Sequence, residues 1–331
     1  MRRPAELRCA PFSWQRPTGD AAPRFVSEWV EVAGEALPAC EEQVDVLVWG
    51  VPLSRTSISA SAASEHPMAF RRLWRGFATY NIDEDVNLAG LRVVDVGDVV
   101  EHVTDSAVTH EAIEQTACFL RTHYPEPFLT TIGGDHSITA CVVRGMQKAE
   151  PSKKIGIIQL DTHFDLRDPA ELGKANGTPI RQLVEEGVVS GQHVHTIGLH
   201  GFFNGEPLKE VADRHGIHYY TMKQTRKRGL EATIADALAA LTTEVDSIYV
   251  TVDMDVLDIS HAPGVPASTP GGMYTDELLD AVLQLGAHPK VAALDIVCLD
   301  PRKDVHDATV KVAVHTWLNA LVGLYKRTSG A

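Results

Sequence analysis

The sequence predicts an α/β protein with one parallel β-sheet that is covered by helices on both faces. Short, largely apolar runs rich in β-branched residues recur from Gln43 onward, and segments with helical periodicity separate them. Runs of this kind are typical of strands buried on both faces. A chain of 331 residues, 44% of them hydrophobic, is long enough to bury such a core. We therefore expect one sheet of about eight strands.

Each expected element follows from the residues of its own run. In chain order, the strand runs read VDVLVW (44–49), RVVDV (92–96), FLTTI (128–132), IGIIQL (155–160), HVHTI (193–197), HYYT (218–221), SIYVTV (247–252) and VAALDIV (291–297). Five segments between and after them have the spacing of amphipathic helices, namely 108–121, 138–148, 230–241, 275–285 and 308–325. Because helices connect the strands, the sheet is expected to be parallel.

The N-terminal sequence, the cysteines and the net charge bear on the domain organisation, the cellular compartment and the class of partner. Residues 1–42 are rich in proline and arginine and lack periodicity, so we expect an N-terminal arm followed by one domain over residues 43–331. Five cysteines without a C-x-x-C pair, and no apolar segment behind the basic N-terminus, favour a cytoplasmic protein. Acids outnumber bases by 44 to 30, and no stretch has membrane-spanning length. We therefore expect a small-molecule partner rather than nucleic acid or a membrane.

Polar residues follow three of the expected strands directly. The motifs GGDHS (133–137), DTHFD (161–165) and DMDVLD (253–258) each begin where an apolar run ends. In open parallel sheets, sites form beyond the carboxyl ends of the strands. All three motifs are therefore expected at one edge of the sheet.

These motifs bring together carboxylates that repel one another and resist burial unless cations neutralise them. Imidazole and carboxylate ligands suit Mn²⁺, and also Zn²⁺, Fe²⁺, Co²⁺ or Ni²⁺, better than Ca²⁺. Two such ions about 3.5–4 Å apart lower the pKa of a shared water. A single D-x-D is common without metal, and Ser137 could simply cap a helix, but neither explanation accounts for three motifs together. The candidate ligands are His136, Asp161, His163, Asp165, Asp253 and Asp255.

The three motifs resemble the signature blocks of the ureohydrolase family, which includes arginase, agmatinase and formimidoylglutamase. The third block extends over TVDMDVLDISHAPGVPASTPGG (251–272), and the second departs from the usual D-A-H-x-D only at Thr162. The similarity runs from about residue 44 to the C-terminal helix. It implies a three-layer α/β fold with an eight-stranded parallel sheet, two Mn²⁺ ions, and hydrolysis of a C–N bond in an amidine or guanidine.

The resemblance also implies a role for each candidate ligand. One ion would be held by His136, Asp161, Asp165 and Asp253, and the other by Asp161, His163, Asp253 and Asp255. Asp161 and Asp253 would bridge the two ions. Asp255 is further expected to carry a proton to the leaving nitrogen.

The position two residues after the second motif narrows the choice of substrate. In this family that position faces the substrate tail, and here it is Arg167. The stretch DTHFDLR followed by GTP (177–179), with LSRTSIS at 53–59, resembles the formimidoylglutamase branch, whose substrate carries two carboxylates. A bidentate arginine suits a carboxylate, so Arg167 is expected to bind one of them. The alternative is that Arg167 merely pairs with Asp168 or Asp165.

Two positions depart from the guanidine-hydrolysing branches of the family. Those branches often place a titratable histidine before the Gly-Thr pair, and this chain has Asn176. They commonly read D-I-V-E near the last strand, whereas this chain ends that run with Cys298. Without the glutamate, a buried guanidinium would lack its counter-charge. We expect Asn176 at a catalytic and substrate-binding position and Cys298 in the lining of the pocket.

The leading hypothesis is a binuclear manganese hydrolase that converts N-formimino-L-glutamate, or a similar carboxylate-bearing amidine, to glutamate and formamide. One alternative is a guanidino-acid or agmatinase-like hydrolase that releases urea. Another is a weakly active metal-binding subunit of a hetero-oligomer. By resemblance, we expect a homo-oligomer, either a trimer or a hexamer.

Overall fold

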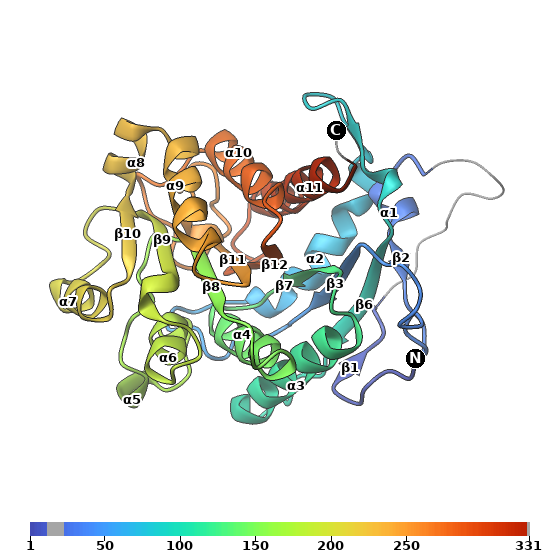
Figure 1. Ribbon diagram of the computed structural model, residues 1–331, viewed down its shortest axis with the longest axis horizontal. Coiled ribbons are helices and arrows are strands. Elements are labelled where there is room, and N and C mark those ends of the chain that lie inside the picture. The colour runs from blue at the N-terminus through green and yellow to red at the C-terminus, as the bar shows by residue number, and fades with distance from the viewer. Residues whose placement is uncertain (12–22, 330–331) are drawn as a thin grey trace.

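The computed structural model of the protein describes residues 1–11 and 23–329 as a central sheet between two layers of helices (Figure 1). The order of strands across the sheet is β1-β6-β3-β7-β12-β11-β8-β9-β10, and β2 also pairs with β6. The strands are β1 (Leu7–Arg8), β2 (Glu31–Val32), β3 (Val46–Gly50), β6 (Val93–Val99), β7 (Phe128–Ile132), β8 (Ile155–Leu160), β9 (Val194–Leu199), β10 (His218–Thr221), β11 (Ser247–Asp253) and β12 (Val291–Val297). A separate hairpin joins β4 (Tyr80–Asn81) and β5 (Val86–Asn87).

The predicted fold class is confirmed, but the predicted count of eight strands is too low. All eight expected runs form strands, and these eight pair with one another in parallel. The sheet has ten strands among the described residues because β1 and β2 add two residues each from the N-terminal segment. Strands this short are held by their partner β6 and have no pattern of their own, so periodicity does not reveal them.

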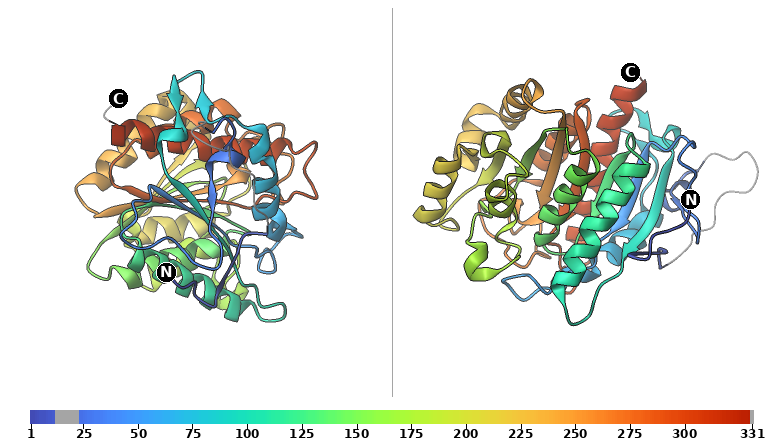
Figure 2. Two further views of the ribbon diagram at one scale, coloured as in Figure 1. Left: turned by 90° about the vertical axis from the view of Figure 1, so that its right-hand side faces the viewer. Right: turned by 60° about the horizontal axis from the view of Figure 1, so that its bottom comes forward.

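The five expected helices all form, and the longer ones cover the two faces of the sheet. The helices are α1 (Val26–Trp29), α2 (His66–Leu73), α3 (Ser106–His123), α4 (Ser137–Ala149), α5 (Pro169–Leu172), α6 (Pro179–Glu185), α7 (Glu206–His215), α8 (Met222–Arg228), α9 (Leu230–Thr242), α10 (Thr275–Gly286) and α11 (Ala308–Ser329). Figure 2 shows the sheet between the layer that contains α3 and α4 and the layer that contains α10 and α11.

Alternate residues of the central strands enter two separate hydrophobic cores. In β8, Ile158 and Leu160 belong to the core beneath α9, α10 and α11, whereas Ile155 and Ile157 belong to the core beneath α3 and α4. Each fully buried side chain of this kind contributes about 1.5–3 kcal/mol. Apolar residues on both faces are therefore required, which explains the largely apolar strand runs.

The described part of the N-terminal segment packs against the domain. β1 pairs antiparallel with β6, and β2 pairs parallel with it. The ring of Trp29 stacks on that of Trp317 in α11 at 6.2 Å between centroids. Residues 12–22 of the expected arm lie outside the described residues. Among the described residues, no helix is both long and apolar enough to span a bilayer.

Four adjacent strands position the polar motifs. β7, β12, β11 and β8 are consecutive in the sheet and run parallel. Their carboxyl ends therefore lie at one edge, where the segments that follow β7, β8 and β11 contain the three motifs. The sheet order, which the sequence does not reveal, makes these segments neighbours.

Candidate metal centre

His136 reaches the site through a tight turn between β7 and α4. A Cβ atom at Gly134 would lie 1.7 Å from the carbonyl oxygen of Leu53, so only glycine fits there. The turn places His136 immediately before α4, with its side chain fully buried. The glycines of the first motif thus serve the position of its histidine.

The segment after β8 turns so that three side chains face inward. The backbone N–H of His163 donates to Oδ1 of Asp161 at 2.6 Å. Asp165 has a φ of +54°, in the left-handed region, which few residues other than glycine adopt. The carboxylate of Asp165 therefore reaches the site because the backbone turns at this residue. The alternation of side chains along an extended strand does not account for its position.

The third segment forms a short 3₁₀ turn, Met254–Val256, directly after β11. The backbone N–H of Asp255 donates to Oδ1 of Asp253 at 2.9 Å. This hydrogen bond fixes the position of the Asp253 carboxylate relative to Asp255.

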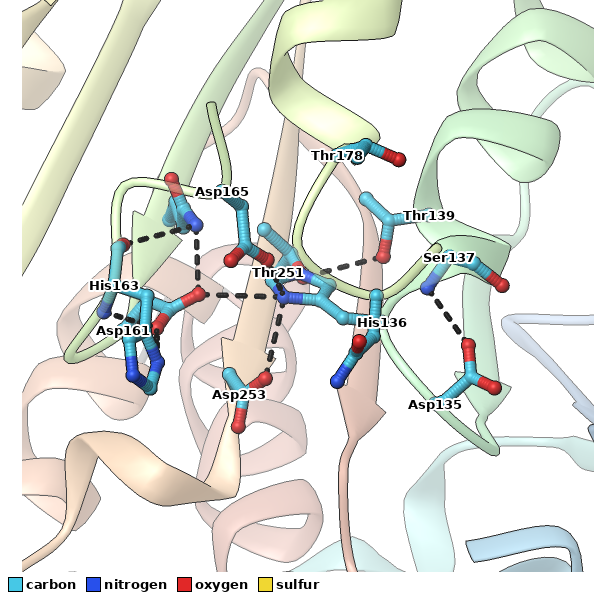
Figure 3. A network of polar contacts seen from close by, with 12 residues as sticks. Asp135, His136, Ser137, Thr139, Asp161, His163, Asp165, Thr178, Thr251 and Asp253 are labelled. Atoms are coloured by element: carbon cyan, nitrogen blue, oxygen red, sulfur yellow. Dashed lines mark hydrogen bonds and ion pairs between the residues drawn. The ribbon is translucent and has the colours of Figure 1, made fainter. Parts of the chain in front are cut away.

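All six candidate ligands lie together, as Figure 3 shows for five of them. Nδ1 of His136 lies 2.7 Å from Oδ2 of Asp165, 3.2 Å from Oδ2 of Asp253 and 3.3 Å from Oδ2 of Asp161. Nδ1 of His163 lies 3.0 Å from Oδ2 of Asp255 and 3.6 Å from Oδ1 of Asp161. Asp161 therefore directs one oxygen toward each histidine.

The candidate ligand atoms are arranged to bind cations rather than to form hydrogen bonds with one another. His136, Asp161 and Asp253 form one group of ligand atoms within 4.8 Å of one another, and Asp161, His163 and Asp255 form a second. Nδ1 of His136 and Oδ2 of Asp165 are buried without a hydrogen-bond partner in the part of the chain that the structure describes, although only 2.7 Å separates them. Two close polar atoms that are not aligned for a hydrogen bond are arranged as ligands of a shared ion are.

The cluster perturbs the ionisation of its members. Burial, with the charges of Asp255 and Asp161, raises the pKa of Asp253 to about 8. Burial and the charge of Asp161 raise the pKa of Asp165 to about 6. Burial opposes the charge of His163, but Asp255 and Asp161 outweigh it and raise its pKa to about 12. Without a metal, protons would thus supply the positive charge that these carboxylates require.

Neighbouring polar residues hold two ligands in place, and the sequence reasoning missed their roles. Gln159 donates from Nε2 to Oδ2 of Asp161 at 2.7 Å and accepts from Oγ1 of Thr196 at 2.8 Å. The hydroxyl of Thr162 donates to the backbone carbonyl of Asp255 at 2.7 Å. A glutamine inside an otherwise apolar strand run was the available signal for the first of these contacts.

The cleft beside the ligands is a cavity of about 90 Å³ whose lining includes His163, Asp255 and Arg167. Arg167 is exposed, and no described acidic side chain forms an ion pair with it. Asp168 instead pairs with Arg181 at 2.9 Å, and Asp165 faces His136. The geometry therefore does not favour the alternative that Arg167 only settles local charge.

Asn176 also lines the cleft, but its side-chain amide binds a neighbouring segment of the protein. Its Oδ1 accepts from the backbone N–H of Ile58 at 2.9 Å, and its Nδ2 lies 3.4 Å from Oγ of Ser57. Its own backbone N–H donates to the carbonyl of Thr56 at 3.0 Å. The residue therefore fastens segment 56–58, of which Ile58 lines the cleft.

Cys298 directly follows β12, is buried, and is not among the residues that line the cavity. Its φ is +61°, and its backbone N–H donates to the carbonyl of Gly134 at 2.8 Å. Burial, with the charges of Asp253 and Asp255, raises the pKa of its thiol well above the ordinary value. The thiol therefore stays protonated and is unsuited to act as a nucleophile.

Comparisons with known proteins agree with the predicted fold and family. Residues 44–323 match the model of the arginase family. A formimidoylglutamase of Halalkalibacterium halodurans is 41% identical over 301 residues, which are 90% of this chain and 94% of that protein. The crystal structure of formimidoylglutamase from Bacillus subtilis has a TM-score of 0.86 at 35% identity and covers 96% of each chain. A structure of Trypanosoma cruzi formiminoglutamase with two Mn²⁺ has a TM-score of 0.82 at 25% identity, covering 93% of this chain and 100% of that one.

Proposed function

The chain belongs to the arginase family, and from this premise we propose that it is a manganese-dependent hydrolase of N-formimino-L-glutamate, with formamide and glutamate as products. One observation carries the proposal. Two histidines and four aspartates converge beside a cleft whose rim bears an arginine without an acidic partner among the described residues. The relatives named above support the same substrate.

The two groups described above, with Asp161 in both and with Asp165 beside His136, would hold two divalent cations. When bound, such a pair lowers the pKa of a shared water and polarises the amidine carbon. Asp255 lines the cleft and is the residue that takes a proton from the attacking water and delivers it to the glutamate nitrogen as the C–N bond breaks. The guanidinium of Arg167 binds a carboxylate of the substrate and so orients the amidine toward the ligands.

The absence of a carboxylate at position 298 weighs against a guanidine substrate. A bound guanidinium keeps its charge at all relevant pH values and needs an acidic partner when buried. The described acidic side chains that line the cleft are Asp165, Asp253 and Asp255, all of them in the ligand cluster. This leaves no free acid in the lining to pair with a guanidinium.

Purified protein loaded with Mn²⁺ is expected to release formamide from N-formimino-L-glutamate and no urea from arginine, agmatine or guanidino acids. Colorimetric detection of urea and chromatographic detection of formamide measure both products on one substrate panel. Urea release from a guanidino acid would establish the alternative hydrolase. Metal binding without turnover of any panel member would favour the weakly active subunit.

We further propose that the enzyme is a homo-oligomer, a trimer or a hexamer, that works in the cytoplasm, with residues 43–331 as the catalytic domain. All five cysteines are free thiols, which supports a reducing compartment. Light scattering of the full chain after size-exclusion chromatography measures the mass. A mass near the 36.0 kDa of one chain would rule out the oligomer.

Manganese is expected to raise the melting temperature more at pH 8 than at pH 6. Without metal, the pKa of Asp253 is raised from 3.8 to about 8 by burial and then by its acidic neighbours. A carboxyl whose pKa is higher in the folded state costs stability progressively as the pH rises from the unfolded to the folded value. A bound cation removes this cost, so its benefit grows across that window.

Thermal melting with Mn²⁺ and with a chelator, at both pH values, measures the difference. The Asp161→Asn variant is the control, since a chain that cannot bind the ions should show no increment at either pH. An increment in the unsubstituted protein that is equal at both pH values, or larger at pH 6, would contradict the prediction.

A further inference from the structure

A buried chain of polar side chains leads from His136 into the middle of the sheet. Nε2 of His136 lies 2.8 Å from Oγ1 of Thr251. Beyond Thr251, Oδ2 of Asp295 accepts hydrogen bonds from the hydroxyl of Thr139 at 2.6 Å and from that of Tyr249 at 2.7 Å. All five side chains belong to residues that are 0% exposed. Polar groups buried this deeply are costly unless they serve one another or a ligand.

Regular secondary structure places each member of this chain. Tyr249 and Thr251 alternate along β11, so they lie on the same face as the ligand Asp253. Asp295 is the register partner of Thr251 on the adjacent strand β12. Thr139 lies in the first turn of α4, three residues after His136. The chain therefore connects the ligand to the rigid centre of the fold.

The hydrogen bonds determine which ring nitrogen of His136 carries the proton. Thr139 donates its hydroxyl hydrogen to Asp295, so at the 3.5 Å contact between the hydroxyls of Thr139 and Thr251 it is Thr251 that donates. The oxygen of Thr251 is then left to accept a hydrogen bond from Nε2–H of His136. Nδ1 consequently presents a lone pair, and it is the atom that faces Asp161, Asp165 and Asp253 without a hydrogen-bond partner.

The second histidine of the site lacks a comparable support. The side chain of His163 is 25% exposed, and among the described residues no hydrogen bond engages its Nε2. Its orientation depends on Nδ1 contacts with Asp255 and Asp161 alone. The two groups of ligands are therefore unequally supported, although they contain the same types of donor.

We propose that Thr251 and Asp295 are positioning residues that hold His136 as an Nδ1 ligand and make the ion at His136 the more tightly bound of the two. The inference rests on the proposed function only in requiring that the site binds two Mn²⁺ ions. Partners that orient a metal-binding histidine typically contribute 10–100-fold to metal affinity. Thr251 and Asp295 act through His136 and do not reach the cleft themselves.

The test compares Thr251→Val, which keeps the shape of the side chain but lacks the hydroxyl, with the unsubstituted full chain. Bound manganese is measured by elemental analysis after equilibrium dialysis across a range of free Mn²⁺, and electron paramagnetic resonance distinguishes paired ions from single ions. The unsubstituted protein is expected to bind two ions with unequal affinity. The valine variant is expected to bind the tighter ion about 10–100-fold more weakly and the other ion as before.

Three further variants make the result decisive. Thr251→Ser restores a hydroxyl and is expected to restore most of the affinity. Thr316→Val removes an equally buried hydroxyl that has no hydrogen-bond partner and is expected to change neither ion. If Thr251→Val does not fold, Asp295→Asn replaces it and is expected to weaken the same ion.

The outcomes separate this inference from the proposed function. Two ions bound by Thr251→Val with unchanged affinities, or both weakened equally, would overturn the positioning role while leaving the enzyme's metal site intact. Failure of the unsubstituted protein to bind Mn²⁺ would overturn the proposed function and this inference together.

Discussion

Replacing Asp253 with asparagine is expected to lower kcat/KM by about 1000-fold or more, because metal ions contribute several kcal/mol of transition-state stabilisation. Oδ2 of Asp253 belongs to the group that contains His136, and Oδ1 holds the turn that positions Asp255. An amide at this position is a poor ligand for a divalent ion and leaves its site without a charge. The loss is expected to appear both in formamide release and in bound manganese.

The same substitution is expected to raise the melting temperature of the metal-free protein at pH 8. The raised pKa of Asp253 means that its charge opposes folding, and asparagine removes that charge. Lost activity combined with gained stability would exclude misfolding as the cause. Asp213→Asn, which alters an exposed carboxylate paired with Lys209, is the matched control and should leave turnover unchanged. Substantial activity in either Asp253→Asn or Asp161→Ala would refute the two-metal mechanism.

Replacing Arg167 with alanine is expected to raise KM for N-formimino-L-glutamate by about 10–100-fold, since a charge-assisted hydrogen bond contributes about 1.5–3 kcal/mol. The guanidinium is exposed at the cleft and has no acidic partner among the described residues, so it is available to a substrate carboxylate. A formamidine of similar size that lacks carboxylates cannot use this contact, and its kcat/KM should change little.

Steady-state kinetics on the two substrates, one with carboxylates and one without, measure the two effects in one variant. Arg167→Lys keeps the charge without the planar fork and is expected to give an intermediate KM. Arg214→Ala, an exposed arginine on α7, serves as the control for loss of surface charge. Equal weakening of both substrates by Arg167→Ala would show that the residue does not bind a carboxylate.

The candidate ligands were accessible from the sequence because each lies within five residues of the end of an apolar run. The segment Asp-Thr-His-Phe-Asp directly after an apolar run indicates both where the strand ends and that a polar site follows, since such groups are costly to bury without a partner. The same local logic located all eight long strands and five helices. It failed for β1 and β2, whose two residues each carry no periodicity.

Roles that depend on contacts between distant segments were less accessible. The sequence placed Asn176 in the site, but its hydrogen bonds to Ser57 and Ile58 cross more than a hundred positions of the chain. Cys298 was expected in the pocket lining, and its backbone N–H binds the carbonyl of Gly134, in the distant turn that follows β7. In both cases the residue type is known from the sequence, but the sequence does not reveal which distant segment lies beside that residue.

By itself, the sequence determined the fold class, the positions of the eight longer parallel strands and the residue types of the candidate ligands after three of them, because these properties are encoded over a few consecutive residues. Only the tertiary structure decided that Asp161 faces both histidines, that Arg167 has no acidic partner among the described residues, and that Thr251 connects His136 to Asp295 through Thr139. These contacts depend on strand order and register across the sheet, and side-chain pairing between strands is invisible in a pattern that is read along one strand at a time.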